Sequence, residues 1–117
     1  MGILSKEDIL KARDEYYEYE EIPEWGGKVK ICAMSLRDRL EFEKMQASID
    51  KKDGTDIDVI LFVLSKSLKD DEGNQLFTVK EAEGLLDKST KAVYHVFKRC
   101  TDVNKTAIDD EELSEKN

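Results

Sequence analysis

Hydrophobic residues recur with a helical period along most of the chain and predict five helices. The strongest signal runs from Ile57 to Leu68, where apolar residues occupy every side of the expected helix. The stretch Val59–Leu64 alone also fits a strand, but the length of the full run favours a helix at the buried centre of the fold. The other four helices follow Ser or Thr residues that commonly cap helices, over residues 6–13, 36–49, 79–86 and about 90–104.

Between the first two helices the pattern changes to the two-residue period of β-strands. The acidic, tyrosine-rich segment Tyr16–Glu21 and the alternating segment Lys28–Met34 predict two strands. Gly26-Gly27 lies between them and can supply the positive φ angles of a two-residue hairpin loop. We therefore expect a β-hairpin near the N-terminus.

The position of the loop determines the register of this hairpin. A loop at Gly26-Gly27 places Ile22 opposite Ile31, and a shifted register pairs Glu21 with Lys30 instead. Ile22 lies on the same face as Ile31 in both registers. We predict that this face is buried.

Together these elements predict an α+β fold, in which an N-terminal β-hairpin packs on a mainly helical domain of four to five helices. We expect residues 1–104 to form a single globular domain. Residues 105–117 lose the apolar pattern and contain five acidic residues, which predicts an acidic flexible tail.

The predicted helix at residues 36–49 carries two separated apolar stripes. The first stripe comprises Leu36, Leu40 and Ala47, and the opposite one comprises Phe42, Met45 and Ile49. Two stripes fit either a helix enclosed within the domain or a helix with one stripe facing a partner protein. We select the second stripe, Phe42, Met45 and Ile49, as candidate protein-binding residues.

Trp25 is the single tryptophan and stands directly before the two glycines of the predicted loop. A ring at this place can cover the open end of a small core while the glycines form the turn. It can instead anchor a partner, because Trp is enriched at interface hot spots. Trp25 therefore joins the candidate protein-binding residues.

Charge and composition restrict the classes of partner. The 117 residues carry a formal net charge of −8, which argues against binding nucleic acid or an anionic membrane surface. Cys32 and Cys100 are far apart in the sequence and predict free thiols in a reducing cytoplasm. We expect neither a signal peptide nor a membrane-spanning segment.

No motif for catalysis or metal binding emerges from the sequence. The loops around Gly54 and Gly73 place apolar residues where an EF-hand requires carboxylates. His95, the single histidine, is expected to be an exposed helix residue between Lys91 and Arg99, without the company that a zinc site or a catalytic base requires. We predict no enzyme activity, no metal and no cofactor. A small enzyme that uses some of the many carboxylates is kept as a less favoured hypothesis.

Several groups of residues, in their order and spacing over most of residues 3–103, resemble one protein family. They are Ile3–Leu10, Ile22–Ile31, Ser35 with Arg39, Phe42 and Glu43, then Asp71–Thr78, Leu85 and Lys88-Ser89. This arrangement resembles the tail assembly chaperones of long-tailed (siphovirus-type) bacteriophages, including prophage copies in bacterial genomes. The segment Tyr16–Glu21 departs from the family pattern, for which more aliphatic residues are expected there.

The resemblance implies a small noncatalytic assembly factor. Such chaperones bind the long tape-measure protein in the cytoplasm of the host bacterium, assist recruitment of tail-tube subunits and are absent from the mature virion. The expected partners are therefore the tape-measure protein and the tail-tube protein, with self-association left open. The alternative is an acidic regulatory adaptor or inhibitor protein that binds a basic partner.

Overall fold

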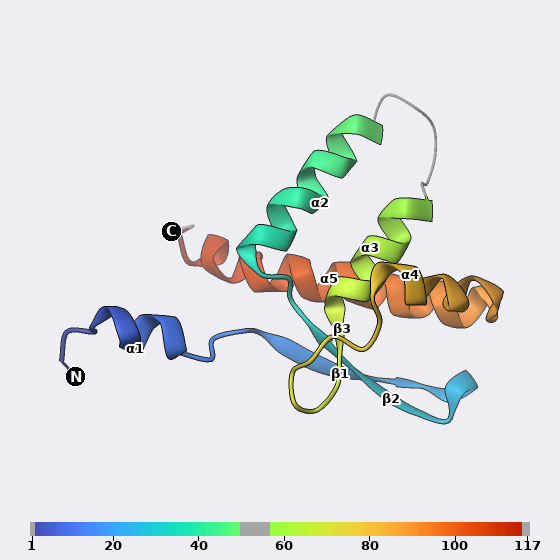
Figure 1. The fold of residues 1–117 in the computed structure, drawn as a ribbon, viewed down its shortest axis with the longest axis horizontal. Helices are drawn as coiled ribbons and strands as arrows, with labels where there is room; N and C mark the ends of the chain where they lie inside the picture. The colour runs from blue at the N-terminus through green and yellow to red at the C-terminus, as the bar shows by residue number, and fades with distance from the viewer. Residues whose placement is uncertain (1, 50–56, 116–117) are drawn as a thin grey trace.

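The computed structural model describes residues 2–49 and 57–115, and it confirms the α+β fold (Figure 1). Its strands form one antiparallel sheet in the order β1-β2-β3, with bounds β1 (Tyr17–Ile22), β2 (Gly27–Cys32) and β3 (Leu68–Lys69). The sequence did not predict β3, because a two-residue strand directly after a helix leaves no period of its own.

Five α-helices lie in the described part of the chain: α1 (Lys6–Lys11), α2 (Leu36–Ile49), α3 (Ile57–Ser67), α4 (Val79–Ala82) and α5 (Thr90–Glu115). Two short 3-10 helices, η1 (Pro23–Trp25) and η2 (Glu83–Asp87), complete the set. Ser5 and Thr78 form capping boxes with Asp8 and Glu81, in agreement with helices that begin after Ser or Thr. A helix occurs at each of the five predicted places, although the one predicted over residues 79–86 divides into α4 and the 3-10 helix η2.

Helix α5 is longer than its apolar pattern indicates. The stripe fades near Asn104, but the helix continues to Glu115. Side chains at Ala107 and Ile108 still border a hollow on the surface of the fold. The division into a globular domain of residues 1–104 and a flexible tail of residues 105–117 stays a prediction.

Helix α3 is the centre of the core, as predicted. Residues Ile57–Ser67 are helical, so the strand alternative for this segment is wrong, and all residues from Val59 to Ser65 are buried. Helix α3 contacts α2, α4 and α5, and α5 in turn contacts both β1 and β2. The side chains at the middle of this core are Ile22, Ile31, Leu64, Leu68, Val96, Cys100 and Val103.

The turn of the hairpin differs from the predicted two-residue loop. The chain reverses through Pro23–Gly26, and Gly27 is already the first residue of β2. Gly26 has a φ of 72°, and its N–H donates to the carbonyl of Pro23 at 3.1 Å. The fixed φ of proline suits the first position of a helical turn, so the reversal begins earlier than the glycines alone suggest.

This turn changes the register but leaves the buried face as predicted. Ile22 pairs with Gly27, and Glu18 pairs with Ile31, so both predicted registers are wrong. Ile22 and Ile31 are nevertheless fully buried, because a shift by an even number of residues keeps each side chain on its face. The observed register also brings Glu18 and Glu20 to this face, beneath α5.

Candidate functional site: apolar protein-binding surfaces

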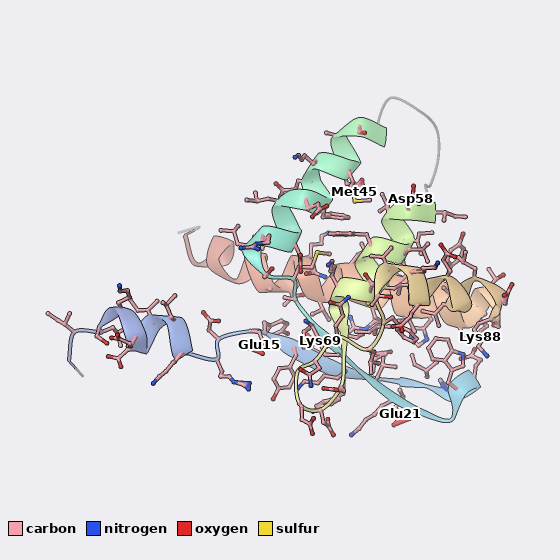
Figure 2. The ribbon with its side chains drawn as sticks, viewed as in Figure 1. Glu15, Glu21, Met45, Asp58, Lys69 and Lys88 are labelled. Carbon is pink, nitrogen blue, oxygen red and sulfur yellow. The ribbon has the colours of Figure 1, made fainter. Side chains whose placement is uncertain are left out.

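Helix α2 turns its predicted binding stripe toward the core and leaves the opposite stripe in solvent. Phe42 and Met45 are half-buried and pack against the core, and Met45 lies on the side of α2 that faces α3 (Figure 2). Leu36 and Leu40 are 73% and 54% exposed. Ile49 is the last residue of α2, and its side chain lies outside the described part of the structure. Partner binding by Phe42, Met45 and Ile49 stays a prediction, and Leu36 and Leu40 are the more accessible apolar residues.

Trp25 is the last residue of η1, in the turn at the tip of the hairpin. Its side chain is half-buried and packs against the core. This position suits a ring that covers the open end of the core. Its predicted second role, as an anchor for a partner, stays a prediction.

Helix α1 presents apolar side chains to solvent. None of its residues is buried, and it stands away from the body of the fold at the start of β1 (Figure 1). Exposed fractions range from 57% to 99% for Ile3, Leu4, Ile9 and Leu10. These side chains are therefore free to contact another protein.

The surface has a hollow of about 570 Å³ next to the segment that follows α1. Its wall contains residues that follow α1, the connection from β2 to α2, and the distal part of α5. Leu36 and Ile108 contribute apolar surface to this wall, and Arg39 contributes a cation. Lys69 and Gly73 add a fourth segment, so four segments that are distant in sequence surround a space that a side chain of a partner can enter.

Asn104, on α5, joins this helix to the β2–α2 connection and to the end of α3. Its Oδ1 accepts a hydrogen bond from the N–H of Met34 at 2.7 Å. Its Nδ2 donates to the carbonyl of Cys100 at 2.8 Å and to Oγ of Ser67 at 3.2 Å. Sequence reasoning missed this residue, because a polar side chain on a helix normally indicates a solvent-facing position.

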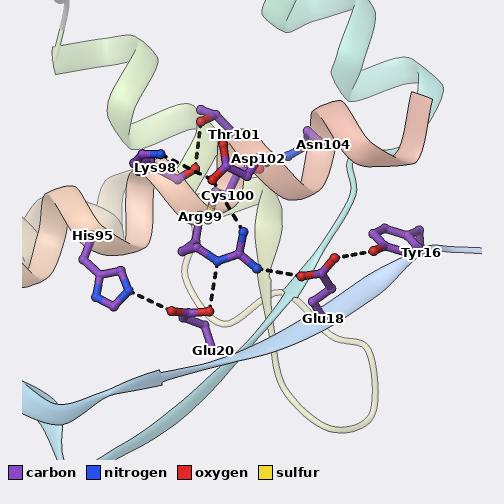
Figure 3. A network of polar contacts seen from close by, with 10 residues as sticks. All are labelled: Tyr16, Glu18, Glu20, His95, Lys98, Arg99, Cys100, Thr101, Asp102 and Asn104. Atoms are coloured by element: carbon purple, nitrogen blue, oxygen red, sulfur yellow. Dashed lines mark hydrogen bonds and ion pairs between the residues drawn. The ribbon is translucent and has the colours of Figure 1, made fainter. Parts of the chain in front are cut away.

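A second polar cluster joins β1 to α5 (Figure 3). Nη2 of Arg99 lies 2.6 Å from Oε1 of Glu18, and Nε of Arg99 lies 2.9 Å from Oε1 of Glu20. His95 contacts the other oxygen of Glu20, with Nε2 at 2.8 Å from Oε2. The hydroxyl of Tyr16 donates to Glu18. One guanidinium thus binds two carboxylates of the same strand face.

These contacts favour the charged forms of Glu18, Glu20 and Arg99. Hydrogen bonds from His95 and then from Arg99 lower the pKa of Glu20, and hydrogen bonds from Tyr16 and then from Arg99 lower the pKa of Glu18. The pKa of Arg99 is raised, chiefly by its hydrogen bond to Glu20. At neutral pH the cluster is therefore an ion-pair network that ties a strand to a helix.

The prediction that His95 is an exposed helix residue is wrong. Its side chain is 34% exposed and hydrogen-bonded to Glu20, because the acidic strand covers the helix face that carries His95 and Arg99. The sequence held a signal for this contact, because Glu18 and Glu20 alternate along the strand while His95 and Arg99 lie one turn apart on the helix. Among the described residues, no group of three or more metal-binding side chains could hold a metal ion.

No family model matches the chain, and no curated protein matches it. Among solved structures, that of the bacteriophage HK97 tail assembly chaperone is similar, with a TM-score of 0.56 over 83% of this chain and 90% of that chain. This chain has the fold of a phage tail assembly chaperone.

The two proteins of this shared fold are 17% identical in sequence. At that identity the likeness establishes the fold alone. For the fold, it confirms the resemblance to tail assembly chaperones that the sequence indicated. No helix in the described part of the chain is long and apolar enough to cross a membrane.

Proposed function

We propose that this protein is a noncatalytic phage tail assembly chaperone, which binds the tape-measure protein and assists recruitment of tail-tube subunits during tail morphogenesis. The observation that carries this proposal is the fold shared with the HK97 tail assembly chaperone. The likeness spans 83% of this chain and 90% of that chain, so it concerns the whole architecture rather than one motif.

The distribution of apolar side chains supports a carrier role. Helix α1 and the outer stripe of α2 expose leucine and isoleucine residues that the fold itself leaves uncovered. A long tape-measure protein is expected to be helical with an apolar stripe, and such a stripe is covered best by exposed apolar residues of another protein. The net charge of −8 favours the solubility of a protein that exposes such residues.

The proposed contact residues lie on α2 and at the hairpin tip. Trp25, Phe42, Met45 and Ile49 are the residues assigned from the sequence. Leu36 and Leu40 extend this set, because they are the exposed apolar residues of α2. In this proposal the protein acts in the cytoplasm of the host bacterium, from a phage or prophage gene, and is absent from the mature virion.

Coexpression tests the proposal directly. The tape-measure protein encoded by the same phage or prophage is produced with and without this chain, and its soluble fraction is measured. We expect the soluble fraction to rise several-fold with the chain present, and the tail-tube protein to be retained on the resulting complex in a pull-down. Equal solubility in both conditions contradicts the proposal.

The salt dependence of the complex separates this function from the acidic-adaptor alternative. Contacts between apolar surfaces persist as ionic strength rises, whereas binding through surface charge weakens steeply. We expect the chaperone complex to survive washing at 0.5 M salt, roughly a Debye length of 4 Å. Release of the tape-measure protein under this wash favours the adaptor.

A further inference from the structure

Strand β1 forms an open edge of the sheet. In the order β1-β2-β3, β2 has a neighbour on each side and β1 has a neighbour on one side. The opposite edge is covered, because Gln75 pairs with Lys69 and the N–H of Leu76 donates to the carbonyl of Leu68 at 3.1 Å. No equivalent segment pairs with β1 among the described residues.

The hydrogen-bond phase of the hairpin shows which backbone groups face outward. The N–H of Ala33 donates to the carbonyl of Tyr16 at 2.9 Å, which starts an alternating antiparallel ladder. In this phase the backbone groups of Tyr17, Tyr19 and Glu21 point away from β2. None of the described hydrogen bonds uses them. The edge therefore offers three N–H and three carbonyl groups to an added strand.

The edge lacks the steric and backbone features that protect many exposed strands. Its residues, Tyr17–Ile22, contain no proline and no lysine, and they pair with β2 without a bulge. Two of its three glutamates turn toward α5, where Arg99 binds them. Steric and backbone features thus leave the edge accessible, and charge decides which partner can use it.

The charge around β1 selects a basic strand. The segment from 14 to 24 contains six acidic residues and no lysine or arginine. Asp14, Glu15, Glu21 and Glu24 form no ion pair within the described residues. A second copy of β1 would bring like charges together, which is destabilising, whereas lysine or arginine side chains would be attracted.

The outer face of β1 already accommodates ammonium groups. Nζ of Lys28 lies 4.8 Å from the ring centroid of Tyr19, and Nζ of Lys30 lies 4.3 Å from that of Tyr17. Both lysines belong to the neighbouring strand β2. A strand added at the other side of β1 would place its own cations next to the same two rings and to Glu21.

We propose that the open edge of β1 binds an extended segment of a partner protein that carries lysine or arginine at alternate positions, as a fourth strand of the sheet. The inference is independent of the proposed chaperone function, since it rests on the edge of β1 and not on the apolar residues of α1 and α2.

Titration with synthetic peptides tests whether the edge of β1 binds a basic strand. The full chain, labelled with ¹⁵N, is titrated with a nine-residue peptide of alternating lysine and valine, and with the same peptide in which glutamate replaces lysine. We expect the lysine peptide to shift the amide signals of Tyr17, Tyr19 and Glu21. The glutamate peptide should bind at least about tenfold more weakly, a difference that shrinks with added salt. Equal binding of the two peptides, or shifts confined to other regions, overturns the proposal.

A matched pair of variants at position 19 separates the contribution of the backbone N–H from that of the side chain. Tyr19→Pro removes the outward-facing N–H, and proline is tolerated at such positions of edge strands. Tyr19→Ala removes the ring but keeps the N–H. We expect Tyr19→Pro to bind the lysine peptide about tenfold more weakly than Tyr19→Ala, as expected for a lost hydrogen bond and displaced backbone. Equal affinities of two folded variants overturn the proposal.

N-methylated peptides decide the question if Tyr19→Pro does not fold. Two versions of the lysine peptide carry N-methyl groups on one or the other set of alternate residues, and both are titrated into the unaltered chain. One version should lose binding, because its methyl groups face β1, and unchanged binding of both versions overturns the proposal. Loss of tape-measure solubilisation with intact peptide binding would concern the chaperone function alone.

Discussion

Oδ1 of Asn104 accepts a hydrogen bond from the backbone N–H of Met34 at 2.7 Å, across 70 residues of sequence. Met34 lies in the connection from β2 to α2, so this bond fixes where α2 leaves the sheet. The same amide binds Ser67 at the end of α3. The orientation of the exposed stripe of α2 therefore depends on a buried side chain of α5.

Replacement of Asn104 tests this dependence. Asn104→Ala leaves the N–H of Met34 and the hydroxyl of Ser67 without their partner in a buried place. We expect the free energy of unfolding to fall by about 1–3 kcal/mol, measured by urea denaturation. Lys105→Ala changes the exposed neighbour and should stay within about 0.5 kcal/mol. Equal effects of the two substitutions would contradict the structural role.

Arg99 should contribute more to stability than the adjacent cation. Arg99→Met leaves Glu18 and Glu20 without their shared cation in a half-buried place. We expect a loss of about 1–3 kcal/mol in the free energy of unfolding and faster amide exchange in β1. Lys98→Met is the control, because the side chain of Lys98 is 72% exposed, and its effect should be below about 0.5 kcal/mol. Similar losses in both variants would argue against the network.

Acidification should destabilise the protein through the same cluster. The pKa of Glu20 is lowered from its ordinary value of 4.5 by His95 and Arg99, so the folded state binds this proton less readily than the unfolded state. The stabilisation is complete above pH 4.5 and is lost as pH falls through the lower pKa of the folded state.

Urea denaturation at a series of pH values measures this loss. Glu20→Gln should reduce the slope of unfolding free energy against pH below about pH 5. Glu24→Gln is the matched control, since Glu24 is exposed and forms no ion pair in the described part of the structure. Parallel curves for Glu20→Gln and the unaltered chain would show that Glu20 is not responsible.

Local patterns predicted the elements of this fold better than its long-range polar contacts. The apolar spacing from Ile57 to Leu68 identified the central helix, and the capping residues Ser5 and Thr78 marked helix starts correctly. The contacts of Arg99 with Glu18 and of Asn104 with Met34 join residues about 70 to 80 positions apart. A local pattern can indicate the charged face of one element, but it does not identify the distant element that pairs with it.

The hairpin turn shows a different limit. Two adjacent glycines predict a loop, but one positive φ angle is sufficient when proline starts the turn. The candidate site on α2 shows the same limit as the hairpin register, because each depends on contacts that local sequence does not determine. The two stripes of α2 were predictable, whereas the stripe that faces solvent depends on where α3 packs.

The two glycines of the hairpin should respond differently to substitution. Gly26→Ala places a side chain at a φ of 72°, and we expect a loss of about 1 kcal/mol in the free energy of unfolding. Gly27→Ala is the control, because Gly27 lies in β2 without a positive φ and has space for a Cβ atom. Thermal unfolding of both variants provides the measurement, and a more harmful Gly27→Ala would contradict the observed turn.

The outer stripe of α2 should matter for partner binding and little for folding. Leu36 and Leu40 are exposed, and lysine has a helix propensity close to that of leucine. The double variant Leu36→Lys, Leu40→Lys should therefore keep its free energy of unfolding within about 1 kcal/mol. If these residues contact the tape-measure protein, the soluble fraction of that protein in coexpression should fall to the level without the chain.

Glu41→Lys, at an exposed position of the same helix, alters the net charge by the same amount as the double leucine variant and serves as its control. It should keep full solubilising activity, because the loss in the double variant is attributed to apolar contact rather than to charge. Phe42→Ala, in contrast, should lower the free energy of unfolding by about 2–3 kcal/mol, because Phe42 packs against the core. Full activity of the double variant would exclude the outer stripe and leave the partner to the inner stripe of Phe42, Met45 and Ile49 or to α1.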